Sequence, residues 1–500
     1  MDNNSTKTGL LGDARRLGEI LAAANRHKLA QGLTPEKVCA MFKDLGTAFI
    51  KTGQLLSLHP EFMPKEYCRA LEALRNDAPT ITTMQIREII SEEYGRPWNQ
   101  VFSRIVGIPV GSASIAQVHE AFLLDGTRVA VKIQRPDSYA RMEQDIRLLK
   151  KALGILKIKQ IEKIMWFINN ALDETWRVAQ QEMDFRQEAE NIDRLGEILA
   201  PMKFACVPKV YHELTTKDVL VMEYIDGIDI SDHEGLLAAG YDLSEVCQKM
   251  IRSYIKQWAE DLFFQADPHS GNMRIRDGQV VWLDLGMMGQ LTEVEANALH
   301  HCMHGIWKND VLEFTEWGLV LFGYDPNPPR KDEIVADFTG FLDKYRVQSI
   351  REMNETGDVF VEMFAIARKY DMEIPMSLTM YGRSLLVMEG TVSDLDDTTD
   401  LAEIIGKHLA AYAIGDGMAG RIARKLSHNR LCSGGPLRHN AYMPEGDGEL
   451  SGNIFTLKLN GSDAEITNEI TGSELTVTRD ELKALAADYS AEVKRLRKRS

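Results

Sequence analysis

The spacing of hydrophobic residues changes along the chain, and each change marks a new segment. Apolar residues recur at helical spacing from Pro35 to His59, and again over 66–75 and 83–94. Between 115 and 134 the pattern becomes that of β-strands, and the intervening Asp125-Gly126 pair predicts a hairpin. The first third of the chain is therefore expected to consist of helices followed by a small sheet.

The rest of the chain is expected to be mainly helical, with a few strands. The expected elements are helices over 138–153, 161–199 and 243–264, a strand over 219–225, strands on either side of Asp277-Gly278, helices from 292 to 426, a loop or linker over 431–450, two or three further strands and a terminal helix over 478–499.

One strand carries a single cation among small and apolar neighbours. In the run Arg128–Gln134, Val129, Val131 and Ile133 share one face of the strand. Lys132 points to the other face. It matches the strand lysine that orients nucleotide phosphates in kinases, provided that a nearby helix supplies a carboxylate partner. A lysine at this spacing also occurs on ordinary exposed strands.

Oxygen-bearing side chains flank a predicted hairpin. Asn272 precedes the turn Asp277-Gly278 and Asp284 follows it at nearly equal distance, so the hairpin brings an amide oxygen and a carboxylate together. Both are hard ligands suited to Mg²⁺. Asp267 lies five residues before Asn272. Each motif alone also occurs in surface turns, but together they have the layout of a kinase catalytic loop and metal-binding loop.

The segment Gln180–Asn191 is an acidic helix in this interpretation. At 3.6 residues per turn Asp184 and Glu188 share a face, while Glu182 points elsewhere. Two carboxylates on one face repel each other unless a cation lies between them, so this helix is a candidate source for the partner of Lys132. A solvated acidic face is the simpler alternative for these residues alone.

A glycine-rich phosphate loop of either common type is absent from the sequence. In its place stands Pro109–His119, whose small residues Ser112, Ala113 and Ser114 permit close approach of the backbone to phosphates, and whose hydroxyls are donors. A second unusual feature is the polar run Lys51-Thr-Gly-Gln54 on an otherwise apolar helix.

These motifs together resemble the UbiB family of atypical protein-kinase-like proteins, the AarF-like proteins associated with quinone biosynthesis. The resemblance covers about residues 35–400. The matching positions are Lys51-Thr-Gly-Gln54, Ser114-Ile-Ala-Gln-Val-His119, Val129-Ala-Val-Lys132, Glu182-Met-Asp184, Glu188, Asp267, Asn272 and Asp284.

The resemblance implies an α+β, two-lobed protein-kinase-like fold with additional helices at both ends. Residues 1–100 would form an N-terminal helical extension, and 101–226 the N-lobe with inserted helices. Residues 227–430 would form the helical C-lobe with the catalytic and metal-binding loops, leaving a small C-terminal extension over 431–500.

The resemblance also implies roles for single residues. Lys132 would contact ATP phosphates and pair with Glu188, Asn272 and Asp284 would hold Mg²⁺, and Asp267 would occupy the place of the catalytic base. Nucleotide binding would further involve Ser112, Ala113 and Ser114, and the hinge strand with Glu223 and Tyr224, which would lie beside adenine.

The Lys51-Thr-Gly-Gln54 segment is implied to fold over the active site. Lys51 and Gln54 would face Glu182 and Asp184 in the groove where a protein substrate would bind. That regulatory arrangement argues against ordinary protein phosphorylation. It implies an ATPase or a small-molecule or lipid kinase, acting on a lipid or quinone precursor. A nucleotide-binding pseudokinase scaffold and an aminoglycoside- or choline-type kinase are the alternatives.

The chain departs from the family pattern in its phosphate loop. Gly111 and Ser112 stand where the family usually has alanines. Because glycine relaxes the backbone, the selectivity for the nucleotide or the tightness of its binding is expected to differ.

Charge and composition narrow the expected partners. The net charge is 58 − 74 = −16, which disfavours nucleic-acid binding. Six cysteines without a CxxC pair, no apparent signal peptide and no long apolar run favour a cytoplasmic protein. A solvated tail is the favoured interpretation of the basic end, 494–499, and a contact to anionic lipid, with peripheral membrane association of the protein, is the alternative. Oligomeric state stays open.

Three histidines and a cysteine lie close together over residues 300–304. His300, His301, Cys302 and His304 lie on one expected helix, and His300 and His304 share a face. This spacing is compatible with a transition-metal site. Because no acidic partner follows at a recognised spacing, ordinary helix packing is the favoured interpretation.

Overall fold

The computed structural model describes most of the chain. The described residues are 3–32, 34–46, 49–50, 52–53, 65–72, 74, 81–112, 115–136, 138–155, 172, 176, 180, 183–324, 328, 330–344, 357–409, 418–437, 448–451, 455–460, 463–468 and 474–478. Every structural statement below refers to these residues.

A four-stranded antiparallel sheet forms the smaller lobe. Its strands β1 (Phe102–Ser112), β2 (Ala116–Leu123), β3 (Arg128–Gln134) and β5 (Val219–Glu223) lie in the order β1-β2-β3-β5. The predicted hairpin joins β2 to β3, and Gly126 takes the φ of 88° that its tight turn requires. Helix α5 (Thr83–Glu93) covers one face, where its buried Ile86 and Ile90 belong to the same apolar cluster as Val129, Val131 and Ile133.

Strand β1 is an element that the hydrophobic pattern did not predict. Gly107, Pro109 and Gly111 interrupt its sequence, and its register against β2 shifts between Ile105 and Pro109 and again between Pro109 and Gly111. Such irregularities remove the period-2 alternation on which strand prediction relies.

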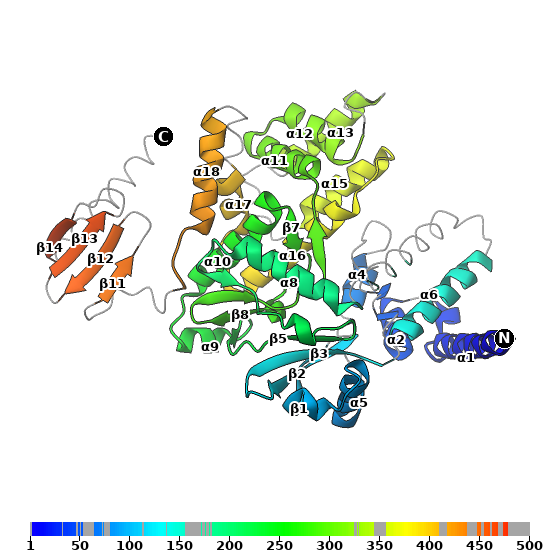
Figure 1. Cartoon of the computed structure of the whole chain (residues 1–500). Helices are drawn as coiled ribbons and strands as arrows, with labels where there is room; N and C mark the ends of the chain where they lie inside the picture. Colours follow the sequence, from blue (N-terminus) through cyan, green and yellow to red (C-terminus); the bar gives the residue numbers. More distant parts are fainter. Residues whose placement is uncertain are drawn as a thin grey trace.

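Helices from the N-terminal part of the chain, together with one helix that follows β3, pack beside this lobe (Figure 1). They are α1 (Asn3–Arg26), η1 (Leu29–Gln31), α2 (Pro35–Leu45), α4 (Lys65–Glu72) and α6 (Ser138–Ile155). The buried Arg16 of α1 joins three of them: its guanidinium contacts Asp145 on α6 at 2.6 Å and the Leu45 carbonyl of α2 at 2.7 Å. The predicted continuous helix from Pro35 to His59 is wrong. Helix α2 ends at Leu45, because Gly46 has a φ of 90° and its N–H closes the helix on Phe42.

The larger lobe contains helix α8 (Phe185–Leu199), short strands and a helical bundle. A second sheet has the order β4-β9-β8-β6, from β4 (Ala205–Cys206), β9 (Gln279–Trp282), β8 (Met273–Arg276) and β6 (Ile228–Asp229). A two-stranded sheet pairs β7 (Phe263–Gln265) with β10 (Met288–Gln290). Helix α10 (Leu243–Ile255) runs into a π-helical turn, η5 (Lys256–Glu260), that leads to β7.

The remaining helices extend the larger lobe (Figure 1). They are α9 (His233–Ala238), α11 (Glu293–Lys308), α12 (Val311–Leu321), α13 (Lys331–Lys344), α15 (Gly357–Lys369), α16 (Met376–Leu395), α17 (Leu401–Leu409) and α18 (Met418–Cys432), with the short 3-10 turn η6 (Ser270–Asn272). Two further 3-10 turns, η2 (Trp98–Gln100) and η4 (His212–Leu214), lie beside β1 and β5 of the smaller lobe. Buried Trp258, Trp282 and Tyr381 lie in the core of the larger lobe. Within the described part of the chain, no helix combines the length and apolar character needed to cross a membrane.

A separate antiparallel sheet follows α18. It has four described strands in sequence order, where two or three were expected: β11 (Gly448–Ser451), β12 (Phe455–Asn460), β13 (Asp463–Asn468) and β14 (Glu474–Thr478). The expected terminal helix and the basic end at 494–499 lie outside the described residues.

Candidate active site

The centre of the candidate site is a buried lysine between two carboxylates. Lys132 Nζ lies 2.8 Å and 2.9 Å from the two carboxylate oxygens of Glu188 and 3.3 Å from Oδ2 of Asp284. Lys132 is 6% exposed and Glu188 3%. Burial alone would lower the pKa of Lys132, but the two carboxylates outweigh burial and raise that pKa above its ordinary value. The lysine is therefore held as a cation, as the sequence predicted for a phosphate-orienting residue.

Helix α8 brings Glu188 to this lysine. Asp184 is the N-cap of α8, and its side chain accepts a hydrogen bond from the Arg186 amide, so Glu188 falls in the first turn and points inward. Phe185 at the start of the helix places its ring centre 5.6 Å from Lys132 Nζ. Further along α8, Asn191 donates to the Leu285 carbonyl at 2.9 Å, which ties the helix to the segment after Asp284.

The predicted shared face of Asp184 and Glu188 is wrong. Asp184 lies before the helix and not within it, because α8 begins at Phe185 and is preceded by a turn at Met183. Its carboxylate pairs with the Arg186 guanidinium at 2.6 Å and 2.8 Å, which lowers the pKa of Asp184. Each carboxylate thus has a cation of its own.

The two predicted metal-ligating residues lie at the open end of one hairpin. In the turn between β8 and β9, Asp277 and Gly278 have φ values of 49° and 73°, as a type I′ turn requires. Met273 pairs with Trp282, so Asn272 and Asp284 emerge just beyond the paired residues of their strands. Leu283 donates to the Asn272 carbonyl at 2.9 Å and extends the ladder by one bond. The hairpin geometry expected from the sequence is confirmed.

The absence of a side chain at Gly286 leaves room beside Asp284. A Cβ at this position would lie 3.2 Å from Asp284 Oδ1 and 3.7 Å from a Glu188 carboxylate oxygen. The Gly286 amide donates to Asp284 Oδ1 at 3.1 Å and orients the carboxylate. Unlike Glu188, the Asp284 side chain is 42% exposed, so it is accessible to a ligand from solvent.

Asp267 lies on a loop that several neighbours hold. Asn272 Nδ2 donates to the Asp267 carbonyl at 3.0 Å. On α16, Arg383 places Nη2 3.4 Å from Asp267 Oδ1, and Ser384 donates to the Gln265 carbonyl at 2.6 Å. Sequence reasoning missed Arg383, because nothing in the spacing of that helix distinguishes it from an ordinary surface arginine.

Gln265 links the loop of Asp267 to the segment of Asp284. Its Oε1 accepts a hydrogen bond from the Asp267 amide at 3.1 Å, and its Nε2 donates to the Asp284 carbonyl. The residue is 1% exposed, and its own amide donates to Gln257 on the π-helical turn at 3.0 Å. The only signal in the sequence was its place two residues before Asp267, where the usual kinase motif has a histidine.

The residues predicted to bind the nucleotide are partly described. Ser112 ends β1, and its hydroxyl accepts a hydrogen bond from Arg135 at 2.9 Å, while Ala113 and Ser114 lie outside the described residues. Glu223 ends β5 and pairs with Arg276 and with the Lys209 amide, so its carboxylate is engaged within the protein.

Tyr224 follows directly, and its ring lies 3.9 Å from the guanidinium carbon of Arg128. The contribution of this hinge residue to nucleotide binding stays a prediction.

The predicted regulatory residues Lys51, Gln54 and Glu182 lie outside the described residues. Between the first two, Thr52 and Gly53 are helical and buried. A Cβ at Gly53 would come within 2.5 Å of Leu74 Cδ1 and 2.8 Å of Phe42 Cδ2. The glycine of this motif is therefore required by packing within the N-terminal helices.

The histidines of α11 contact neighbouring residues of the larger lobe. His300 is buried, with its ring centre 5.9 Å from that of Trp258. His301 and His304 both contact Glu313 of α12, at 2.7 Å and 2.8 Å. Within the described part of the chain, no three or more His, Cys, Asp or Glu side chains are arranged so that they could hold a metal ion. Helix packing, the favoured interpretation, accounts for the segment.

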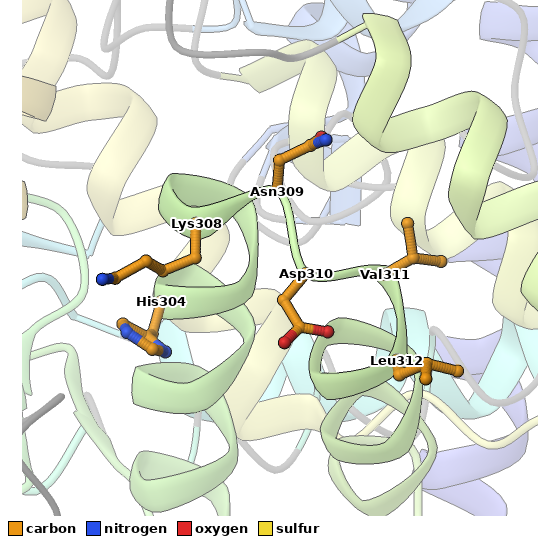
Figure 2. A pocket seen from close by; sticks show the side chains of 6 residues that line it. All are labelled: His304, Lys308, Asn309, Asp310, Val311 and Leu312. Carbon is orange, nitrogen blue, oxygen red and sulfur yellow. The ribbon is translucent and has the colours of Figure 1, made fainter.

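A hollow of about 580 Å³ lies where α11 turns into α12 (Figure 2). His304 and Lys308 line it from α11, and Asp310 lines it from the connection. In Figure 1 this turn is at the far end of the larger lobe from β3, so the hollow is not part of the Lys132 site.

Comparison with known proteins identifies the family. A model of the ABC1 atypical kinase-like domain matches residues 73–317, and a model of the UbiB helical domain matches 339–400. An uncharacterized protein from the hydrogenase 1 5′ region of Clostridium pasteurianum is 32% identical over 372 residues, which cover 74% of this chain and 70% of that protein. The chain belongs to the ABC1 atypical kinase-like family. The two-lobed kinase-like fold expected from the sequence is thereby confirmed.

Two relatives of this ABC1 family protein carry informative names. The chloroplastic protein ACTIVITY OF BC1 COMPLEX KINASE 7 of Arabidopsis thaliana is 28% identical and matches 70% of this chain and 50% of that protein. The AarF domain-containing protein kinase 1 of Xenopus laevis is 34% identical and matches 49% of this chain and 48% of that protein. The chain thus spans about half the length of these two relatives.

Proposed function

We propose that this ABC1 family protein is a Mg²⁺-dependent, ATP-binding enzyme, either an ATPase or a small-molecule or lipid kinase. The acceptor or client would be a lipid or a quinone precursor, and the work would support quinone or isoprenoid-lipid metabolism. Peripheral association with a membrane surface would bring the protein to such a client. The observation that carries the proposal is the Lys132–Glu188–Asp284 arrangement.

The charges of this arrangement suit a nucleotide. Glu188 holds Lys132 through both carboxylate oxygens, so the lysine keeps a fixed position and a positive charge in a buried place. A fixed ammonium there would offset the negative charge of the α- and β-phosphates. Asp284 is held by the weaker contact of 3.3 Å, so it can exchange Lys132 for another cation without leaving Glu188 unpaired.

The donors around Asp284 fit a magnesium ion. Asp284 and Asn272 are a carboxylate and an amide, Asp284 is partly exposed, and Gly286 leaves space beside its carboxylate. Magnesium needs only one or two protein ligands when phosphates and water complete its shell. When bound, the ion would neutralise negative charge on the phosphates.

Asp267 would act on the hydroxyl or water that receives the phosphoryl group. Its carboxylate is presented by a loop that Asn272, Arg383 and Gln265 hold in place. A carboxylate at this position would accept a proton from the attacking hydroxyl or water. The resemblance of the Lys51-Thr-Gly-Gln54 segment to a cover over the protein-substrate groove favours a small acceptor.

One observation favours a second candidate, a nucleotide-binding pseudokinase scaffold. The contact between Lys132 and Asp284 pairs the lysine with a residue that would hold metal in an active enzyme. If this pair persists when nucleotide binds, Asp284 cannot ligate Mg²⁺ and turnover fails.

The decisive experiment is ATP hydrolysis by the purified full chain with Mg²⁺, with and without anionic liposomes plus a phenolic quinone-precursor mimic. Turnover that Asp284→Asn abolishes would support the enzyme. Asp277→Asn is the matched control, because Asp277 lies in the turn of the same hairpin and Asn also tolerates its positive φ.

Nucleotide-dependent stabilisation without turnover under any condition would favour the scaffold. Wild-type turnover in Asp284→Asn would show that the metal assignment is wrong.

A further inference from the structure

A cavity of about 630 Å³ lies between α10, α17 and α18, apart from the Lys132 site. Its volume is that of a typical pocket for a small molecule. The apolar part of its wall consists of Ile255, Ile404, Leu426 and Leu431. The charged part includes the guanidinium groups of Arg252 and Arg430.

The acidic residues of the cavity already have partners. Asp400 accepts a hydrogen bond from the Glu403 amide at 2.9 Å, at the start of α17. Glu403 in turn forms an ion pair with Lys407, one turn further along the same helix. Both carboxylates therefore interact with groups of α17 itself.

The two arginines differ from these acids. Arg252 is half-buried, and its guanidinium donates to the Ser433 carbonyl at 3.5 Å. Burial, without an opposing carboxylate, lowers the pKa of Arg252 below its ordinary value. Across the described ranges, neither Arg252 nor Arg430 lies within ion-pair distance of a carboxylate. Arg252 is partly removed from water without an anion, which is costly, and a bound anion would relieve that cost, whereas Arg430 is exposed and can reach the same anion from the rim.

Polar groups beside the arginines complete the lining. Ser427 of α18 and His408 of α17 are both buried, and Oγ and Nδ1 lie 2.7 Å apart. Burial lowers the pKa of His408 to about 4, so the imidazole is neutral at pH 7. Because Lys407 is paired with Glu403, the positive charge left for a ligand in the cavity comes from the two arginines.

We infer that this cavity binds an organic anion, a carboxylate or phosphate monoester attached to an apolar body. The guanidinium groups of Arg252 and Arg430 would take the anionic group, and the four apolar side chains would cover the body. This inference concerns binding alone, so it stands or fails independently of the proposed ATP-dependent activity.

The helix that lines the cavity continues along the chain toward the candidate catalytic loop. Arg252 and Ile255 belong to the last turn of α10, which continues directly into the π-helical turn η5. Within that turn Gln257 accepts a hydrogen bond from the Gln265 amide at 3.0 Å, and Gln265 contacts both Asp267 and Asp284. An anion in the cavity would thus be held next to the segment that supports the catalytic residues.

The test is calorimetric titration of the full chain with octyl phosphate and octanoate, with octanol as the neutral analogue. Arg252→Met and Arg430→Met should each weaken binding of the two anions about tenfold or more, because each removes a charge-assisted hydrogen bond. Lys425→Met is the matched control, since Lys425 is exposed on α18 but does not line the cavity.

Equal affinity for the anions in wild type and in both arginine variants would overturn the inference, as would absence of binding to wild type. Equal affinity for octanol would contradict a role for charge, and full competition by inorganic phosphate would contradict a role for the apolar body.

A second measurement separates ligand binding from a structural role of Arg252. Without ligand, Arg252→Met should keep or raise the melting temperature, because it removes a half-buried charge that no carboxylate compensates. A lowered melting temperature would mean that Arg252 serves the fold through Ser433.

Flotation with phosphatidylglycerol vesicles then identifies the source of the anion. Vesicle binding that both arginine variants lose indicates a lipid headgroup, and titration without vesicle binding indicates a free amphiphilic anion.

Discussion

The guanidinium of Arg383 on α16 lies 3.4 Å from the carboxylate of Asp267 on the candidate catalytic loop. Arg383 falls within the UbiB helical domain, whereas Asp267 falls within the ABC1 kinase-like domain. Ser384 and Thr391 of the same helix bind the carbonyls of Gln265 and Pro268. The helical domain thus contacts the candidate catalytic base directly, and it supports the loop on both sides of that base.

Removal of the Arg383 guanidinium should therefore impair turnover more than nucleotide binding. For Arg383→Ala we expect kcat for ATP to fall about tenfold or more while KM changes little, because Arg383 contacts Asp267 and not the residues that would line the phosphates. Arg330→Ala, which removes an exposed arginine paired to Glu333, serves as control. A raised KM with unchanged kcat would instead place Arg383 at the nucleotide.

The Lys132–Glu188 pair should be strongly coupled in folding. Lys132→Met leaves Glu188 buried without its cation, and we expect the free energy of unfolding to fall by about 3–5 kcal/mol. The double variant Lys132→Met/Glu188→Met should regain most of this loss. Urea denaturation of the four proteins gives the coupling directly. Additive losses in the double variant would show that the two side chains act independently.

Gln265 should stabilise the two loops that it joins. Gln265→Leu keeps most of the side-chain volume but removes the side-chain amide. The Asp267 N–H and the Asp284 carbonyl then each lose a hydrogen-bond partner. We expect a loss of about 1–3 kcal/mol in the free energy of unfolding, from two part-buried polar groups that lose a partner. Gln279→Leu is a control, because Gln279 binds the Lys203 carbonyl at the exposed end of the same hairpin. Equal stability of both variants would contradict the linking role.

Acid should destabilise the larger lobe through its buried histidines. Burial lowers the pKa of His300 to about 3 and that of His408 to about 4, from 6.5. Because the folded-state pKa values are depressed, each residue favours the folded state fully above about pH 6.5. This contribution is lost as the pH falls toward 4, by about 1.4 kcal/mol per pH unit for each histidine.

Urea denaturation at pH 7, 6 and 5 measures this slope. His300→Phe keeps a ring beside Trp258 and should reduce the loss between pH 6 and pH 5. An unchanged slope in this variant would assign the acid sensitivity to other groups.

Gly53 tests the packing of the N-terminal helices. Gly53→Ala would place a Cβ 2.5 Å from Leu74 and 2.8 Å from Phe42, and we expect a destabilisation of about 1–3 kcal/mol. Gly18→Ala is the control, because a Cβ at Gly18 of α1 meets nothing within 4 Å. A melting temperature that Gly53→Ala leaves unchanged would contradict the close packing of this segment.

The sequence predicted the parts of the site that local rules determine. The Asp277-Gly278 turn sets the register of β8 and β9, and the register sets where Asn272 and Asp284 emerge. Alternation along β3 likewise separated Lys132 from Val129, Val131 and Ile133.

Predictions failed where one residue changed the path of the chain. Gly46 ends α2, and Asp184 caps α8 instead of lying within it. Arg383 could not be identified, since its contact with Asp267 depends on how a distant helix packs and leaves no local pattern.

The hairpin that carries both candidate ligands also limits how the chain can vary. Asn272 and Asp284 are brought together only because the number of residues between them matches a two-residue turn. One inserted residue in that turn would shift one strand against the other by a single position and turn the following side chains to the opposite face of the sheet. A change in the length of this turn would therefore displace both candidate ligands, although the turn lies at the opposite end of the hairpin from them.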